Sequence, residues 1–127
     1  MKLYLLFFLP ILISCSTSKP IIQTGIKEIN FGTGGGFTGE VKTYVLTTES
    51  KLLEKGKELK KVKSETTLSL YNKALVVKDY SFNEPDNMYM FIEIKTNEKT
   101  NRIVWHVGSK IDDKIIELYN NLISITK

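Results

Sequence analysis

Residues 88–95, MYMFIEIK, and residues 102–107, RIVWHV, decide the fold, and the polar turn Asn97-Glu98-Lys99 lies between them. Both runs are rich in β-branched and aromatic residues, which favour strands, so they predict an antiparallel hairpin. After the hairpin, apolar residues recur at spacings of three and four, which places them on one face of a helix. These residues are Ile111, Ile115, Leu118, Tyr119, Leu122 and Ile123. A strand hairpin followed by an amphipathic helix indicates an α+β domain.

The same patterns predict the remaining strands. Residues 41–47, VKTYVLT, predict a strand, and residues 26–31 alternate apolar and polar as a shorter one. The lysine-rich stretch 51–63 surrounds Gly56 and predicts a hairpin at the edge of the sheet, where lysines discourage pairing with another chain. We therefore expect an α+β fold, with a mostly antiparallel sheet of about five strands and two helices packed on one face.

A first helix is expected at residues 64–77. Its apolar face is predicted to carry Leu68, Tyr71, Ala74 and Leu75, which recur at spacings of three and four. For the last helix, Ser109 is predicted to be the N-cap, because Asp112 follows three residues later in a pattern close to a capping box.

Cys15 is the only cysteine, and it follows Leu12-Ile13-Ser14 at the end of a short apolar run behind Lys2. This arrangement resembles the lipobox of bacterial lipoproteins, which implies cleavage before Cys15 and lipid attached to its sulfur and amino terminus. An ordinary secretory signal and a buried strand are the alternatives. The run of 11 apolar residues from Leu3 to Ile13 is too short for a spanning helix, which needs about 20.

The expected organisation is a signal peptide at residues 1–14, a lipidated Cys15 and tether at residues 15–25, and a single α+β domain at residues 26–127. Ser16 is not the aspartate that retains many lipoproteins in the inner membrane, and no acidic cluster follows Cys15. We therefore expect the outer membrane, with the domain facing the periplasm and held to the membrane by its lipid.

Charge excludes nucleic acid as an expected partner. Without residues 1–14 the chain has 17 basic and 14 acidic residues, a net charge of +3, and Arg102 is its only arginine. Nucleic-acid binders show clustered basic residues, often with aromatics, and this chain has no such cluster. We expect an envelope protein as the partner instead.

No catalytic set can be assembled from the sequence. Gly34, Gly36 and Gly39 have the spacing of a dinucleotide-binding loop, but a strand follows them rather than a helix, so we expect no nucleotide. His106 is the only histidine, so it has no second histidine or cysteine with which to bind zinc. Asp112 and Asp113 are explained by capping and the helix dipole. We expect no enzymatic activity, no metal and no cofactor.

Two segments are candidates for binding a partner. The first comprises Gly34, Gly35, Gly36, Phe37 and Thr38, where glycines would let a partner's backbone approach closely; the alternative is a wide turn that needs positive φ at several positions. The second comprises Tyr80, Phe82 and Asn87, because aromatic residues are enriched at interfaces; the alternative is that this turn closes one end of the sheet.

Three segments resemble a group of small lipoproteins from Bacteroidota whose activity is not established. They are residues 31–39 (FGTGGGFTG), residues 82–89 (FNEPDNMY) and residues 103–105 (IVW). The group tends to have Pro-Gly-Asn and Trp-Gly where this chain has Pro85-Asp86-Asn87 and Trp105-His106. Gly35-Gly36-Phe37-Thr38-Gly39 is also similar to the opening segment of emfourin-like inhibitors of thermolysin-type metalloproteases. The first resemblance brings no activity with it, and the second implies protease inhibition. We expect a membrane-anchored, non-enzymatic binding module of the cell envelope, because of the lipobox, the compact domain and the absence of a catalytic set, with protease inhibition as the alternative.

Overall fold

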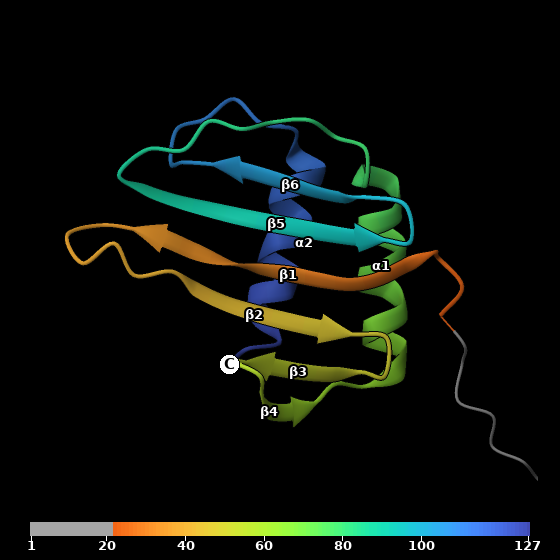
Figure 1. Cartoon of the computed structure of the whole chain (residues 1–127). Helices are drawn as coiled ribbons and strands as arrows, with labels where there is room; N and C mark the ends of the chain where they lie inside the picture. Colours follow the sequence, from red (N-terminus) through yellow and green to blue (C-terminus); the bar gives the residue numbers. More distant parts are fainter. Residues whose placement is uncertain (1–21) are drawn as a thin grey trace, which may run out of the picture.

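The computed structural model describes residues 22–127, so Cys15, the expected signal peptide and most of the expected tether lie outside the described residues. Its elements follow in the order β1 (Ile26–Gly35), β2 (Lys42–Thr47), β3 (Lys51–Glu54), β4 (Lys57–Lys61), α1 (Ser64–Val77), β5 (Met88–Thr96), β6 (Thr100–Trp105) and α2 (Asp113–Ser124) (Figure 1). The predicted order of strands and helices is confirmed.

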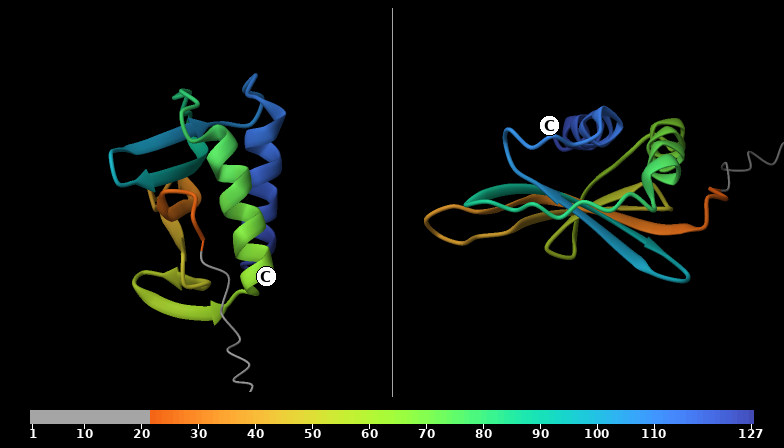
Figure 2. Two further views of the ribbon diagram at one scale, coloured as in Figure 1. Left: turned by 90° about the vertical axis from the view of Figure 1, so that its right-hand side faces the viewer. Right: turned by 90° about the horizontal axis from the view of Figure 1, so that it is seen from above.

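The described residues form one antiparallel sheet of six strands in the order β4-β3-β2-β1-β5-β6. Within residues 22–127, both helices lie on the same face of this sheet, and the other face carries no helix (Figure 2). The fold is therefore α+β, as expected, with one strand more than the expected five.

The core lies between the sheet and the two helices. Alternate residues of the strands point toward the helices, so Phe31 of β1 lies beside Tyr44 of β2, with ring centroids 5.5 Å apart. On the helix side, Trp105 packs edge-on against Tyr119 at 5.1 Å. The largest side chains that are fully buried in this core are Trp105, Tyr71, Phe31, Ile29, Leu46, Leu52, Ile92, Ile94, Ile103, Ile115 and Leu118.

Strand β1 is longer than predicted. The expected strand ended at Phe31, but β1 continues to Gly35. It pairs with β5 from Ile26 to Gly35 and with β2 from Glu28 to Thr33. Positions 32 and 34 within the strand are occupied by glycine because neighbouring groups fill the space that a side chain would take. A Cβ on Gly32 would collide with the carbonyl group of Lys42, and one on Gly34 with the ring of Tyr89.

The buried face of α1 differs from the predicted one. Its buried residues are Thr67, Leu70, Tyr71, Ala74 and Val77, so the assignments of Tyr71 and Ala74 are confirmed. Leu75 is exposed and Leu68 is only half-buried, so the assignment of both to this face is wrong. Helix α1 carries apolar residues around most of its circumference, and tertiary contacts therefore select the face. One such contact is the hydrogen bond of 2.7 Å that the Tyr71 hydroxyl donates to the Leu46 carbonyl oxygen.

Helix α2 begins at Asp113, so Ser109 is not its N-cap. Asp112 takes that position, and its carboxylate accepts a hydrogen bond of 2.9 Å from the Lys114 amide. Ser109 instead accepts a hydrogen bond of 3.0 Å from the His106 amide, which tightens the turn after β6. Asp112 therefore caps the helix, but as the N-cap itself and not as the third residue of a capping box that begins at Ser109.

The two edges of the sheet are protected differently. Strand β4 forms one edge, as predicted, and its lysines are largely exposed. At the other edge, the Val104 amide of β6 donates a hydrogen bond of 3.0 Å to the Phe82 carbonyl oxygen. The Glu84 amide donates a second, also of 3.0 Å, to the Val104 carbonyl oxygen. The segment before β5 therefore covers part of the β6 edge.

Candidate functional site

A turn of residues 36–41, here called the glycine loop, joins β1 to β2. Gly35, Gly36 and Gly39 have φ angles of +85°, +84° and +62°, in the left-handed region that other residues rarely adopt. The Gly39 amide donates a hydrogen bond of 3.2 Å to the Gly36 carbonyl oxygen, and the Glu40 amide donates one of 3.4 Å to the Thr38 hydroxyl. Between residues 32 and 41, positive φ is thus confined to these three glycines, whereas Gly32 and Gly34 have strand conformation within β1.

The glycine loop rests on the segment that leads into β5. The Gly36 amide donates a hydrogen bond of 2.6 Å to the Asn87 carbonyl oxygen. A Cβ on Gly35 would collide with the same carbonyl group, whereas a Cβ on Gly36 would meet nothing within 4 Å. The base of the loop is therefore held against Asn87, and the space beside Gly36 is open.

Phe37 is displayed on this support. Its side chain is fully exposed, with a relative accessibility of 114%. Thr38 beside it is exposed as well, and Met88, which pairs with Gly35 across the β1–β5 ladder, is 68% exposed. An exposed aromatic side chain gains no burial free energy in the isolated domain but would gain it in a partner's pocket, so Phe37 is a candidate anchor for a partner.

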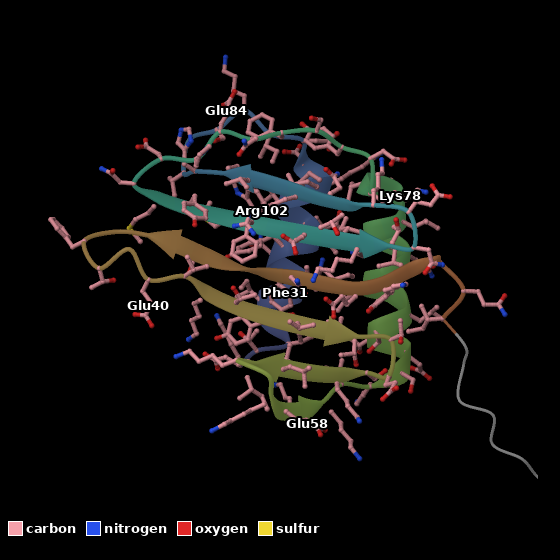
Figure 3. All side chains as sticks on the ribbon, in the orientation of Figure 1. Phe31, Glu40, Glu58, Lys78, Glu84 and Arg102 are labelled. Atoms are coloured by element: carbon pink, nitrogen blue, oxygen red, sulfur yellow. The ribbon has the colours of Figure 1, made fainter. Side chains whose placement is uncertain are left out.

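A hollow of about 420 Å³ lies between the glycine loop and the turn that joins β3 to β4. Its charged lining residues are Glu40, Lys42, Glu54 and Lys55. The pKa of Lys42 is raised above its usual value, first by its interaction with the Tyr44 hydroxyl and then by the carboxylates of Glu54 and Glu40. In Figure 3, Glu40 points from the glycine loop toward the side of the sheet on which β3 and β4 lie.

The structure brings together the predicted residues Gly34, Gly35, Gly36 and Asn87, and it places Phe37 and Thr38 on the loop that they support. Tyr80 and Phe82 are not part of this group. They are half-buried, stack at 6.3 Å and pack against the core beside β6. The Asp112 amide donates a hydrogen bond of 3.3 Å to the Tyr80 hydroxyl. This geometry favours the structural explanation for Tyr80 and Phe82, in which they close an edge of the sheet.

The sheet face without helices carries a polar cluster that the sequence reasoning missed. The guanidinium of Arg102 lies 4.2 Å from the centre of the buried Phe91 ring. Glu93 accepts a hydrogen bond of 3.1 Å from the Asn30 side-chain amide and lies 3.3 Å from Arg102 Nη1.

Lys95 extends this cluster through an ion pair of 2.9 Å with Glu28, which raises the pKa of Lys95. The alternation of Tyr89, Phe91, Glu93 and Lys95 along β5 is the signal that could have predicted it. The charged members pair with one another, whereas the buried side-chain oxygen of Asn30 has no hydrogen-bond partner among the described residues, and we regard the cluster as the cover of Phe91.

His106 has a structural environment. Its Nδ1 lies 2.8 Å from the Glu84 carbonyl oxygen and 3.1 Å from the Ser109 hydroxyl. Because a carbonyl oxygen can only accept, the proton lies on Nδ1 in this contact. Within residues 22–127, no three His, Cys, Asp or Glu side chains are grouped in a way that could hold a metal ion. Neither helix in that range is both long and apolar enough to span a membrane.

No protein family, curated protein or solved structure matches the chain.

Proposed function

We propose that this protein is a bacterial lipoprotein whose domain is a non-enzymatic binding module of the cell envelope. Lipid on Cys15 holds it to the membrane, most simply to the outer membrane with the domain in the periplasm. The observation that carries the binding function is the display of Phe37, fully exposed on a loop whose base is hydrogen-bonded to Asn87.

Two features of the glycine loop support this proposal. A fixed loop loses less conformational entropy on binding than a mobile one, and the hydrogen bond between Gly36 and Asn87 restrains its base. At Gly36 and Gly39, the position that a Cβ would take has no neighbouring atoms within 4 Å, so a partner can approach the backbone on both sides of Phe37.

The lipid anchor is tested together with the partner. The intact protein and a Cys15→Ala variant are each used for cross-linking and pull-down from solubilised envelope, with identification by mass spectrometry. We expect a specific envelope protein with the intact form, and reduced or no recovery with Cys15→Ala if the tether sets access to that partner. Recovery of nothing above a tag-only control would reject the binding function, and unlipidated Cys15 in the purified protein would reject the anchor.

The geometry of the glycine loop also favours a second candidate, inhibition of a thermolysin-type metalloprotease. Gly35-Gly36-Phe37-Thr38-Gly39 forms an exposed turn with one large side chain, a shape that fits an apolar subsite in a cleft. Titration of thermolysin with the domain of residues 22–127 tests this candidate. Inhibition that is lost in Phe37→Ala supports it, and full residual protease activity at saturating domain rejects it for this protease.

A further inference from the structure

Exposed apolar side chains gather at one end of the sheet. The large hydrophobic residues that are exposed in residues 22–127 are Phe37, Val41, Leu59, Leu75, Val76, Met88 and Val107. Phe37 and Val41 belong to the glycine loop, Met88 begins β5, and Val107 follows the end of β6. Because β1, β5 and β6 are antiparallel neighbours, the end of β1, the start of β5 and the end of β6 share one end of the sheet. We call it the apolar end and define it by these four residues.

The chain enters the domain at the opposite end. Ile26 begins β1 and pairs with Thr96, the last residue of β5, whereas Gly35 ends β1 and pairs with Met88, the first. Figure 1 shows this arrangement: β1 starts on the right, where residues 22–25 enter, and ends on the left at the glycine loop. Ten strand residues at about 3.3 Å each separate the two ends by roughly 30 Å.

From this polarity we infer that the apolar end is the docking surface, and that it binds a protein with an apolar pocket for Phe37 on the side of the domain away from the membrane. The inference rests on the proposed lipid anchor. A tether of nine residues, 16–24, reaches about 30 Å at most, so it keeps the entry end of the domain near the bilayer. The apolar end is then the end of the domain opposite the point at which the tether is attached.

The chemistry of the apolar end fits a protein better than a bilayer. The glycine loop contains no basic residue and carries Glu40, whereas segments that bind anionic membranes are rich in Lys and Arg. Beside it, the hollow of about 420 Å³ presents both signs of charge, through Glu40 and Glu54 on one hand and Lys42 and Lys55 on the other. An apolar anchor beside a rim of mixed charge is the usual anatomy of a protein interface.

Site-specific photo-cross-linking in the intact lipoprotein tests the inference. A photoreactive residue is placed at position 37, and matched controls carry it at position 76 on α1 and at position 27 at the entry end. Binding of the purified adduct partner is then measured for the double variant Phe37→Ala with Met88→Ala and for the control Val76→Ala, since Val76 is as exposed as Met88, at 68%. We expect a protein adduct from position 37 alone, an affinity at least tenfold lower for Phe37→Ala and Met88→Ala together, and unchanged affinity for Val76→Ala.

Three other cross-linking results would overturn the inference, and they differ in what they leave of the proposed binding function. A partner captured at position 76 or 27 but not at 37 overturns the inference and leaves the proposed binding function standing. Lipid adducts at position 37 show that the apolar end faces the bilayer and also overturn it. No protein adduct from any position, together with an empty pull-down, rejects the binding function and this inference with it.

Discussion

Gly35 and Gly36 form a matched pair for testing how the glycine loop is held. Their φ angles are nearly equal, +85° and +84°, so alanine at either position suffers the same left-handed strain of about 1–2 kcal/mol. The two positions differ in space: a Cβ on Gly35 would collide with the Asn87 carbonyl group, whereas a Cβ on Gly36 has open surroundings.

The collision sets the expected difference between the two variants. The Asn87 carbonyl group is backbone, so relief requires β1 and β5 to separate locally, which breaks the hydrogen bond of 2.6 Å from the Gly36 amide. Loss of that bond costs about 1 kcal/mol. We therefore expect Gly36→Ala to lower the free energy of unfolding by about 1–2 kcal/mol and Gly35→Ala by about 2–3 kcal/mol.

Urea denaturation of the domain of residues 22–127, which contain the described hydrophobic core, measures both values. Equal m-values would show that the surface exposed on unfolding is unchanged, and the lower entropy of the unfolded chain with alanine is common to both variants and cancels in their comparison. Hydrogen exchange provides the second measurement, because the Gly36 amide should lose protection in Gly35→Ala. Equal destabilisation in the two variants, with unchanged exchange at Gly36, would refute the role assigned to Asn87.

Three further predictions concern the core and the open sheet face. Tyr71→Phe should cost about 1–2 kcal/mol, because the Leu46 carbonyl oxygen loses a buried donor; a loss of only a few tenths in urea denaturation would contradict this. Arg102→Ala should lower the free energy of unfolding by about 0.5–1 kcal/mol, because it uncovers the Phe91 ring. Arg102→Met should lower it less, because methionine still covers most of the ring. Equal losses of stability in the two variants would indicate that the charge of Arg102, and not its cover, is responsible. Burial raises the pKa of Tyr119 to about 12. The stability that this residue contributes is therefore complete below about pH 10 and falls as the pH rises toward 12, a decline that Tyr119→Phe should reduce in denaturation series across that range.

The strand hairpin at the C-terminal half can be predicted because its signal is local. Residues 88–96 alternate between side chains that face the helices and side chains that face away, and the turn that follows is polar. The extension of β1 through Gly32 and Gly34 cannot be predicted in that way. Glycine weakens a strand when judged by propensity, and its reason here is the approach of Lys42 and Tyr89, which belong to other strands.

The face of α1 shows a second limit of local reasoning. Spacings of three and four fit the predicted set around Leu68 and Leu75 as well as the buried set around Leu70 and Tyr71. The choice depends on which side chain reaches the sheet, and the Tyr71 hydroxyl reaches the Leu46 carbonyl oxygen. A rotation of the helix by one residue position would lose that contact.

The sequence predicts two separate candidate segments, and the pairing of β1 with β5 decides which residues join. Gly35 and Gly36 meet Asn87 across about fifty residues of sequence because their strands are neighbours in the sheet. The sequence contains no local indication of that pairing. Tyr80 and Phe82 belong to the same predicted segment as Asn87, yet they pack against the core beside β6.

The distribution of glycines separates the needs of the fold from those of the loop. A turn requires glycine where φ is positive, which accounts for Gly36 and Gly39. Gly32 and Gly34 have ordinary strand angles, and each costs about 0.5–1 kcal/mol relative to alanine in a strand that is paired on both sides. This cost is offset because the absence of side chains leaves room for the Lys42 carbonyl group beside Gly32 and for the Tyr89 ring beside Gly34. Those groups bring β2 and β5 close against the last residues of β1, so these glycines hold in place the strand end from which Phe37 is displayed.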